Sequence, residues 1–162
     1  MTDLFGLEGK RLELLAPLSG KVVPLELVPD PVFAERMMGD GVALMPDEGG
    51  NVLAPCDGEL AALFPTGHAF GIRGAHGLEI LVHVGIDTVS LEGEGFALLA
   101  SAGDTVKAGE PIVRFDLALV ASKAPSLLTP VIITTGELVK SLSAAFGRVR
   151  AGVDVLLTVE AK

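Results

Sequence analysis

The sequence predicts an all-β fold: an antiparallel β-sandwich or barrel with internal duplication and a few short helical turns. Hydrophobic residues make up 49% of the 162 residues, but they occur in short blocks separated by 20 glycines and 10 prolines. This pattern favours many strands and turns over long helices. Turn-then-strand units also recur, as is typical of compact β-sandwiches and barrels. We expect a short N-terminal segment, 1–15, and a single domain over 16–162.

A turn-and-strand pattern that occurs twice in the sequence predicts the duplication. Residues 16–20 (APLSG) precede an expected strand over 21–27, and residues 54–58 (APCDG) precede one over 59–64. Strand periodicity would give each of these strands one shared face. The expected faces are Val23, Leu25 and Leu27 in the first strand, and Leu60, Ala62 and Phe64 in the second. A third unit of this kind feeds a strand over 112–115.

Helix signals are brief. Asp30 is a candidate N-cap with Pro31 at the first helical position, which predicts a helix through about Met38 that Gly39 ends. Three further elements are expected: a helix over 116–124 that ends before Pro125, a turn after Thr135, and a closing strand over 153–159.

Composition excludes several classes of function. The net charge of −9 disfavours nucleic acid and anionic membranes, and it favours a basic protein partner. Tyrosine and tryptophan are absent, so base-stacking platforms are not expected. No apolar stretch approaches the roughly 20 residues that cross a bilayer, and the N-terminus lacks a signal-peptide core, which predicts a cytoplasmic protein. Cys56, the single cysteine, is expected to be a small packed residue.

His83 is the main candidate for chemistry. In Glu79–Val84, alternation places Ile80, Val82 and Val84 towards the core and His83 on the outer face, followed by Gly85, which leaves room for close approach. A neutral imidazole can attack phosphorus through one nitrogen while a hydrogen bond holds the other. The pattern alone also fits a structural histidine.

His68 precedes His83 by 15 residues, enough for a hairpin to bring the two side by side. A second donor near the phosphoryl oxygens would stabilise their charge. If its segment is extended, His68 shares a strand face with Phe70 and Ile72. Separately, the spacing leaves open that the two histidines never meet. His76, in a glycine-flanked turn, is expected to be a solvated loop residue.

Other chemistries lack their motifs. No His-x-His, His-Glu-x-x-His or Cys-x-x-Cys is present, so a constitutive metal is not expected. The glycine-rich stretches lack the lysine and serine or threonine of a phosphate-binding loop. We therefore expect no cofactor, and a phosphoryl group would arrive on a partner.

Residues 83–96 (HVGIDTVSLEGEGF), with GHAF at 67–70, resemble the glucose-type enzyme IIA (EIIA) family of bacterial sugar phosphotransferase systems. The similarity extends over nearly the whole chain. It includes APLSG, VPDPVFAERMMGDGVA at 28–43, APCDG, GDTVKAG, and LTPVII at 128–133.

The resemblance implies a β-sandwich with two histidines in a shallow apolar depression. It implies that His83 is phosphorylated on Nε2, that a backbone carbonyl near Gly85 fixes its other nitrogen, and that His68, oriented by Thr66, hydrogen-bonds the phosphoryl group. It further implies the histidine-containing phosphocarrier HPr as donor and a cysteine on the EIIB domain of a membrane permease as acceptor.

The family's partner-binding rim is apolar with acidic residues around it, and several of its apolar positions could equally be core. The corresponding residues are Asp30, Val32, Phe33, Met37, Met38, Phe64, Phe70, Asp87 and Val89. Departures from the family are Gly67 for asparagine, Leu81 for phenylalanine, and Pro31 in the short helix; they affect docking rather than chemistry. The segment before Ala16 is too short for a membrane-anchoring amphipathic helix, so no membrane insertion is expected.

Two alternatives remain. The first is a non-transferring regulatory module of the same fold that binds target proteins, although His68, His83 and Thr66 are retained and regulation could coexist with transfer. The second is a zinc peptidase or a lipoyl- or biotinyl-type carrier on a similar duplicated fold. The peptidase would need metal ligands where Ile72 and Gly85 stand, and no lysine fits the carrier.

Overall fold

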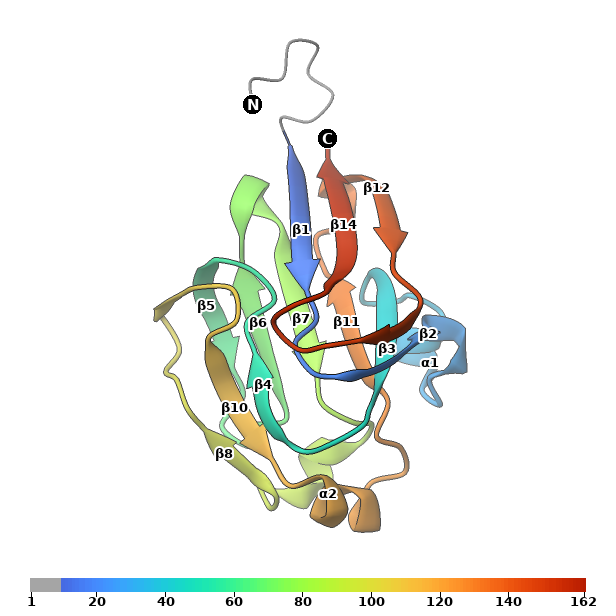
Figure 1. Cartoon of the computed structure of the whole chain (residues 1–162), viewed down its shortest axis with the longest axis vertical. Helices are drawn as coiled ribbons and strands as arrows, with labels where there is room; N and C mark the ends of the chain where they lie inside the picture. The colour runs from blue at the N-terminus through green and yellow to red at the C-terminus, as the bar shows by residue number, and fades with distance from the viewer. Residues whose placement is uncertain (1–9) are drawn as a thin grey trace.

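Antiparallel strands make up most of the computed structural model, which describes residues 10–162. This confirms the predicted all-β class. The large sheet contains, in spatial order, β13 (Gly147–Val149), β2 (Gly20–Pro24), β3 (Asp40–Pro46), β11 (Thr129–Ile133), β7 (Glu79–His83), β6 (Ala69–Arg73), β5 (Gly58–Leu63) and β9 (Thr105–Val106). Two three-stranded sheets are β1 (Arg11–Leu15), β14 (Val155–Ala161) and β12 (Val139–Ala144), and β4 (Gly50–Leu53), β10 (Pro111–Phe115) and β8 (Phe96–Leu98). In Figure 1 the small sheets lie in front of the large one.

The strand order shows the predicted duplication. Strands β2, β3 and β11 occupy one half of the large sheet, and β5, β6 and β7 occupy mirrored places in the other half. The turns before β2 and β5 bond each other reciprocally. Leu15 N–H donates to the carbonyl of Pro55, and Leu53 N–H donates to the carbonyl of Pro17, both at 2.8 Å. β7, which carries His83, therefore lies at the centre of the sheet, where the two halves meet.

Two strand predictions were wrong in detail. β2 ends at Pro24, and the chain continues as the 3₁₀ turn η1 (Leu25–Leu27), so Leu25 is buried while Leu27 is exposed. Proline has no N–H for a further ladder bond. In β5 the register shifts between Leu60 and Ala62. A β-bulge of this kind reverses the alternation, so Leu60 is buried and Ala62 is exposed.

Both helices lie where the sequence predicted them. α1 (Pro31–Ala34) begins where the Asp30 side chain accepts the N–H of Val32 at 3.0 Å, and it ends sooner than expected because Arg36 adopts a left-handed conformation. α2 (Leu117–Lys123) matches the prediction. The segment after Thr135 forms the expected turn, η4 (Gly136–Leu138), but then continues as β12, which the sequence analysis missed; the closing strand is β14.

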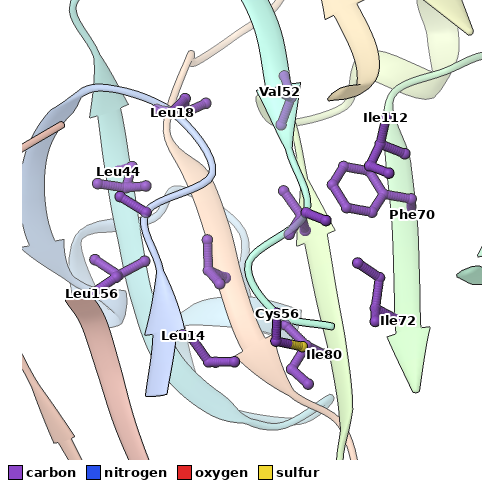
Figure 2. Close-up of a cluster of buried hydrophobic side chains, with 14 of the residues drawn as sticks. Leu14, Leu18, Leu44, Val52, Cys56, Phe70, Ile72, Ile80, Ile112 and Leu156 are labelled. Atoms are coloured by element: carbon purple, nitrogen blue, oxygen red, sulfur yellow. The ribbon is translucent and has the colours of Figure 1, made fainter. Parts of the chain in front are cut away.

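The main hydrophobic core fills the space between the large sheet and the two small ones. Figure 2 shows side chains from both layers in it, among them Leu14, Phe70 and Ile112. Cys56 is also in this core, 2% exposed, and burial raises the pKa of its thiol to about 12. Cys56 is therefore the small packed residue that was predicted.

A second, smaller cluster covers part of the outer face of the large sheet. Its buried members are Leu25, Val28, Phe33, Ala43, Ile86, Leu128 and Ile132. They come from η1, α1, β3, β11 and the segments next to these elements. The short helical turns η1 and α1 therefore cover the outer face of the half that contains β3 and β11.

The predicted domain began at residue 16, but the preceding strand also belongs to the fold. β1, within the segment assigned to 1–15, pairs with β14 along its whole length, so residues 11–15 form part of the fold. Residues 1–9 lie outside the described residues. Within 10–162, no helix is both long enough and apolar enough to cross a membrane.

Candidate active site

His83 ends β7 on the outer face of the large sheet. Ile80, Val82 and Val84 are each at most 1% exposed in the main core, whereas the side chain of His83 is half-buried on the opposite side. This is the alternation that the sequence predicted.

The backbone carbonyl of Gly85 holds the ring of His83 in one orientation. His83 Nδ1 lies 2.8 Å from the carbonyl oxygen of Gly85, which can only accept, so Nδ1 carries the proton and Nε2 carries the lone pair. Gly85 has φ of +72°, and a Cβ there would lie 2.7 Å from Thr88 Cγ2. Any other residue would be strained at this position. The glycine is therefore required for the carbonyl to reach His83.

His68 meets His83 across the hairpin. It lies in the bend before β6, and its carbonyl accepts Val84 N–H at 2.7 Å. The two imidazole centroids are 5.1 Å apart, with ring planes at 77°. The prediction that His68 shares a strand face with Phe70 and Ile72 applied only to an extended segment, and His68 instead lies in a bend outside β6. Gly67, just before it, has φ of +76°. Glycine and asparagine, the family's residue here, are the types that best accept this conformation.

Thr66 lies beside His68, with Thr66 Oγ1 at 2.5 Å from His68 Nδ1. This contact agrees with the orienting role that the resemblance implied. Phenylalanine rings flank both imidazoles: Phe33 lies 5.1 Å from His83, and Phe64 lies 5.2 Å from His68, between centroids. The site is thus a pair of imidazoles with an aromatic ring against each.

The residues predicted for the rim divide into two groups. Exposed or half-buried positions are Asp30, Val32, Met37, Met38, Phe64, Asp87 and Val89. Phe33 is 4% exposed and belongs to the second cluster, where its ring contacts His83. Phe70 is fully buried in the main core, so we correct its assignment: its side chain is not available to a partner. His76 is exposed in its turn, as predicted.

Burial keeps both imidazoles neutral. It lowers the pKa of His68 to about 4, and the neighbouring His83 lowers it further in the same direction. Burial also lowers the pKa of His83, although the Gly85 carbonyl and the carboxylate of Asp30 oppose this shift. Near neutral pH, His83 therefore has a free lone pair for attack.

Two residues at the site were missed by the sequence analysis. Thr88 and Thr129 are both completely buried beside the turn that follows His83. Their signal in the sequence is weak: a threonine within or beside an apolar run, which is also common in ordinary strands. Within residues 10–162, no group of three or more histidine, cysteine, aspartate or glutamate side chains is arranged to hold a metal ion.

The fold and the histidine pair define the class: an EIIA component of a sugar phosphotransferase system. Residues 12–139 match the model of the family described as phosphoenolpyruvate-dependent sugar phosphotransferase system, EIIA 1. The chain belongs to this family, and so has a phosphocarrier role in such a system.

Individual relatives are similar over most of their length. The glucose-specific EIIA component of Bacillus cereus is 51% identical over 146 residues, which cover 89% of this chain and 88% of the relative. That of Staphylococcus epidermidis is 45% identical over 133 residues, covering 82% and 80%. The structure of glucose permease IIA from Mycoplasma capricolum superposes with a TM-score of 0.87 at 43% identity, covering 92% of this chain and 96% of that one.

Proposed function

We propose that His83 accepts a phosphoryl group on Nε2 from phosphorylated HPr in the cytoplasm and passes it to a cysteine on the EIIB domain of a sugar permease. The observation that carries this proposal is the hydrogen bond from His83 Nδ1 to the Gly85 carbonyl. It commits the proton to Nδ1, so the nitrogen that must attack phosphorus is free.

In the first transfer, the lone pair of His83 Nε2 forms a bond to phosphorus as the phosphorus–nitrogen bond to the donor histidine breaks. The electron pair of that bond stays on the donor. In the second transfer, the cysteine thiolate attacks the same phosphorus, and the electron pair returns to Nε2. Such transfers need little covalent help from the protein beyond positioning and charge stabilisation.

We propose that His68 supplies that stabilisation. A hydroxyl proton donated by Thr66 to His68 Nδ1 would leave the other ring proton on Nε2, free to donate to a phosphoryl oxygen. The centroid separation of 5.1 Å supports this role because it leaves His68 within reach of a group bound to His83.

The surface around the histidines supports protein partners. Met37 is 70% exposed and Val89 is 54% exposed, with the carboxylates of Asp30 and Asp87 nearby in sequence. Exposed apolar side chains near acidic residues in sequence, on a chain of net charge −9, suit partners that offer apolar side chains and a basic residue. The names of the three relatives support a glucose-type permease as the acceptor.

The test is incubation with enzyme I, HPr and phosphoenolpyruvate, followed by intact-mass measurement. We expect an acid-labile gain of about 80 Da, one phosphoryl group, in the wild type. His83→Gln should show no gain, and His76→Gln, which changes the exposed turn histidine, should match the wild type. Stable phosphorylation of His83→Gln would contradict the assignment. A folded wild-type protein that takes no phosphate from an active donor would favour a non-transferring regulatory module.

A further inference from the structure

Buried polar side chains concentrate around the candidate active site. Among residues 10–162, the polar side chains that are buried are His68, Thr88 and Thr129, at 3%, 0% and 0% exposed. Burial of a hydroxyl in an apolar interior costs free energy unless the hydroxyl forms hydrogen bonds. Valine would fill nearly the same space at no such cost, so the two threonines call for a physical reason.

Both hydroxyls bond the same peptide group. Thr88 Oγ1 donates to the carbonyl of Val84 at 2.7 Å. Thr129 Oγ1 accepts the N–H of Gly85 at 3.3 Å and donates its own proton to the carbonyl of Leu127 at 3.0 Å. The Val84 carbonyl and the Gly85 N–H are the two ends of one planar peptide group. This group is therefore held at both ends by buried side chains.

The next peptide group is the one that contacts His83. Its carbonyl, from Gly85, accepts the Nδ1 proton of His83 at 2.8 Å, and its N–H, from Ile86, donates to the carbonyl of Ser126 at 2.9 Å. Gly85 joins the two groups, and glycine has wide conformational freedom. Without the threonines, the backbone before Gly85 would lose both of its side-chain contacts, and the direction of the Gly85 carbonyl would be less restricted.

We propose that Thr88 and Thr129 are positioning residues that set the tautomer of His83 by holding the Val84–Gly85 peptide. When the Gly85 carbonyl is displaced, the Nδ1 proton loses its acceptor, and the proton moves to Nε2 in a larger fraction of molecules. A protonated Nε2 has no lone pair for phosphorus. The effect on phosphoryl transfer rests on the proposed function of His83; the effect on the tautomer does not.

The test uses variants that separate hydroxyl from shape. Thr88→Val and Thr129→Val keep the branched shape and remove the hydroxyl, whereas Thr88→Ser keeps the hydroxyl and removes the methyl group that lies against Gly85. Nitrogen-15 NMR of the histidine rings reports the tautomer, and rapid mixing with phosphorylated HPr reports the rate. For each valine variant we expect the ratio of Nε2–H to Nδ1–H tautomer on His83 to rise about tenfold, the cost of one hydrogen bond, and the rate to fall in proportion to the Nδ1–H fraction that is lost. Thr88→Ser should stay close to the wild type in both.

The control is Thr134→Val, just past the opposite end of β11, where an exposed hydroxyl donates to the carbonyl of Glu79, far along the strand from His83. It should leave both readouts unchanged. Valine variants that keep the Nδ1–H tautomer would overturn the proposal, as would a loss in Thr88→Ser equal to that in Thr88→Val, which would mean packing alone.

Two other outcomes can each be told apart from a failure of this proposal: valine variants that do not fold, and a wild type that accepts no phosphate. If the valine variants do not fold, hydrogen exchange of the wild-type Gly85 amide decides: we expect strong protection, and exchange at the rate of an open turn would overturn the proposal. A wild-type protein that accepts no phosphate would contradict the proposed function, while the tautomer measurements would still decide the role of the threonines.

Discussion

The two halves of the large sheet differ in what covers their outer face. Ile132 in β11 and Leu81 in β7 are direct cross-strand partners, so both side chains point to this face. Ile132 is fully buried in the cluster with Leu25, Val28 and Phe33, whereas Leu81 is only half-buried. The duplicated fold thus has one half covered by η1 and α1 and one half left open.

The difference explains where the site lies. The ring of Phe33, in the covered half, lies 5.1 Å from that of His83 on β7, the strand of the open half beside β11. Beyond it, a hollow on the open half is lined in part by Met38, Gly71 and Leu81. The proposed nucleophile, His83, thus has an apolar wall on one side, which favours its neutral form, and open surface on the other, which a partner can reach. The asymmetry between the halves therefore supplies both properties that phosphoryl transfer between proteins needs.

The largest expected effect contrasts the two halves directly. Ile132→Ala should destabilise the fold by about 3 kcal/mol, because it opens a cavity under the cover, whereas Leu81→Ala should cost about 1 kcal/mol because that side chain is already partly exposed to solvent. Urea unfolding of both variants checks this. Equal losses would mean that η1 and α1 do not bury Ile132 in solution.

The next effect concerns chemistry at the boundary. His68→Gln should still accept phosphate on His83, but onward transfer to EIIB should slow by about a hundredfold, the typical cost of one lost transition-state donor. Quenched-flow measurement of both steps separates acceptance from delivery. Delivery at the wild-type rate would make His68 a structural residue.

Sequence periodicity correctly predicted which face of a strand a side chain points to, wherever the strand is regular. It placed His83 and Val82 on opposite faces of β7 correctly, because the two-residue period of a strand directly determines its faces. It failed where one residue breaks the period, at Pro24 in β2 and after Leu60 in β5. Pro24 ends its strand, and the bulge in β5 reverses the faces of the side chains that follow it.

The histidine pair could not be derived from the sequence pattern alone. It depends on the register in which Ala69 pairs with His83 and on the turn at Gly67, neither of which alternation specifies. The 15-residue spacing allowed a hairpin that brings His68 and His83 together but left that open, and the family resemblance then favoured the pair. Thr129 was missed for a similar reason: its partner, the Gly85 amide, is 44 residues away in the chain.

Acid should weaken the fold through His68. Its folded-state pKa of about 4 lies below the ordinary value near 6.5, so the unfolded chain binds a proton that the folded site resists. The stability that the neutral ring provides is complete above about pH 6.5 and is lost as the pH falls towards 4. Urea midpoints across this range should fall more steeply for the wild type than for His68→Gln. Parallel curves would contradict the low pKa of His68.

The smallest effect tests how the cover influences the nucleophile. Asp30 caps α1 by accepting the N–H of Val32, and its charge also raises the pKa of His83. Asp30→Ala should therefore cost about 1 kcal/mol of stability and lower the pKa of His83. Asp30→Asn, which keeps a capping oxygen without the charge, should lower that pKa with little loss of stability.

Asp116→Ala is the matched control, because Asp116 caps α2 through the N–H of Leu119. It should cost a similar free energy and leave the pKa of His83 unchanged in an NMR titration. If Asp116→Ala shifts this pKa as much as Asp30→Ala does, the shift follows general loosening of the fold. If only the two Asp30 variants shift it, the covered half acts on the nucleophile of the open half through the charge of one carboxylate.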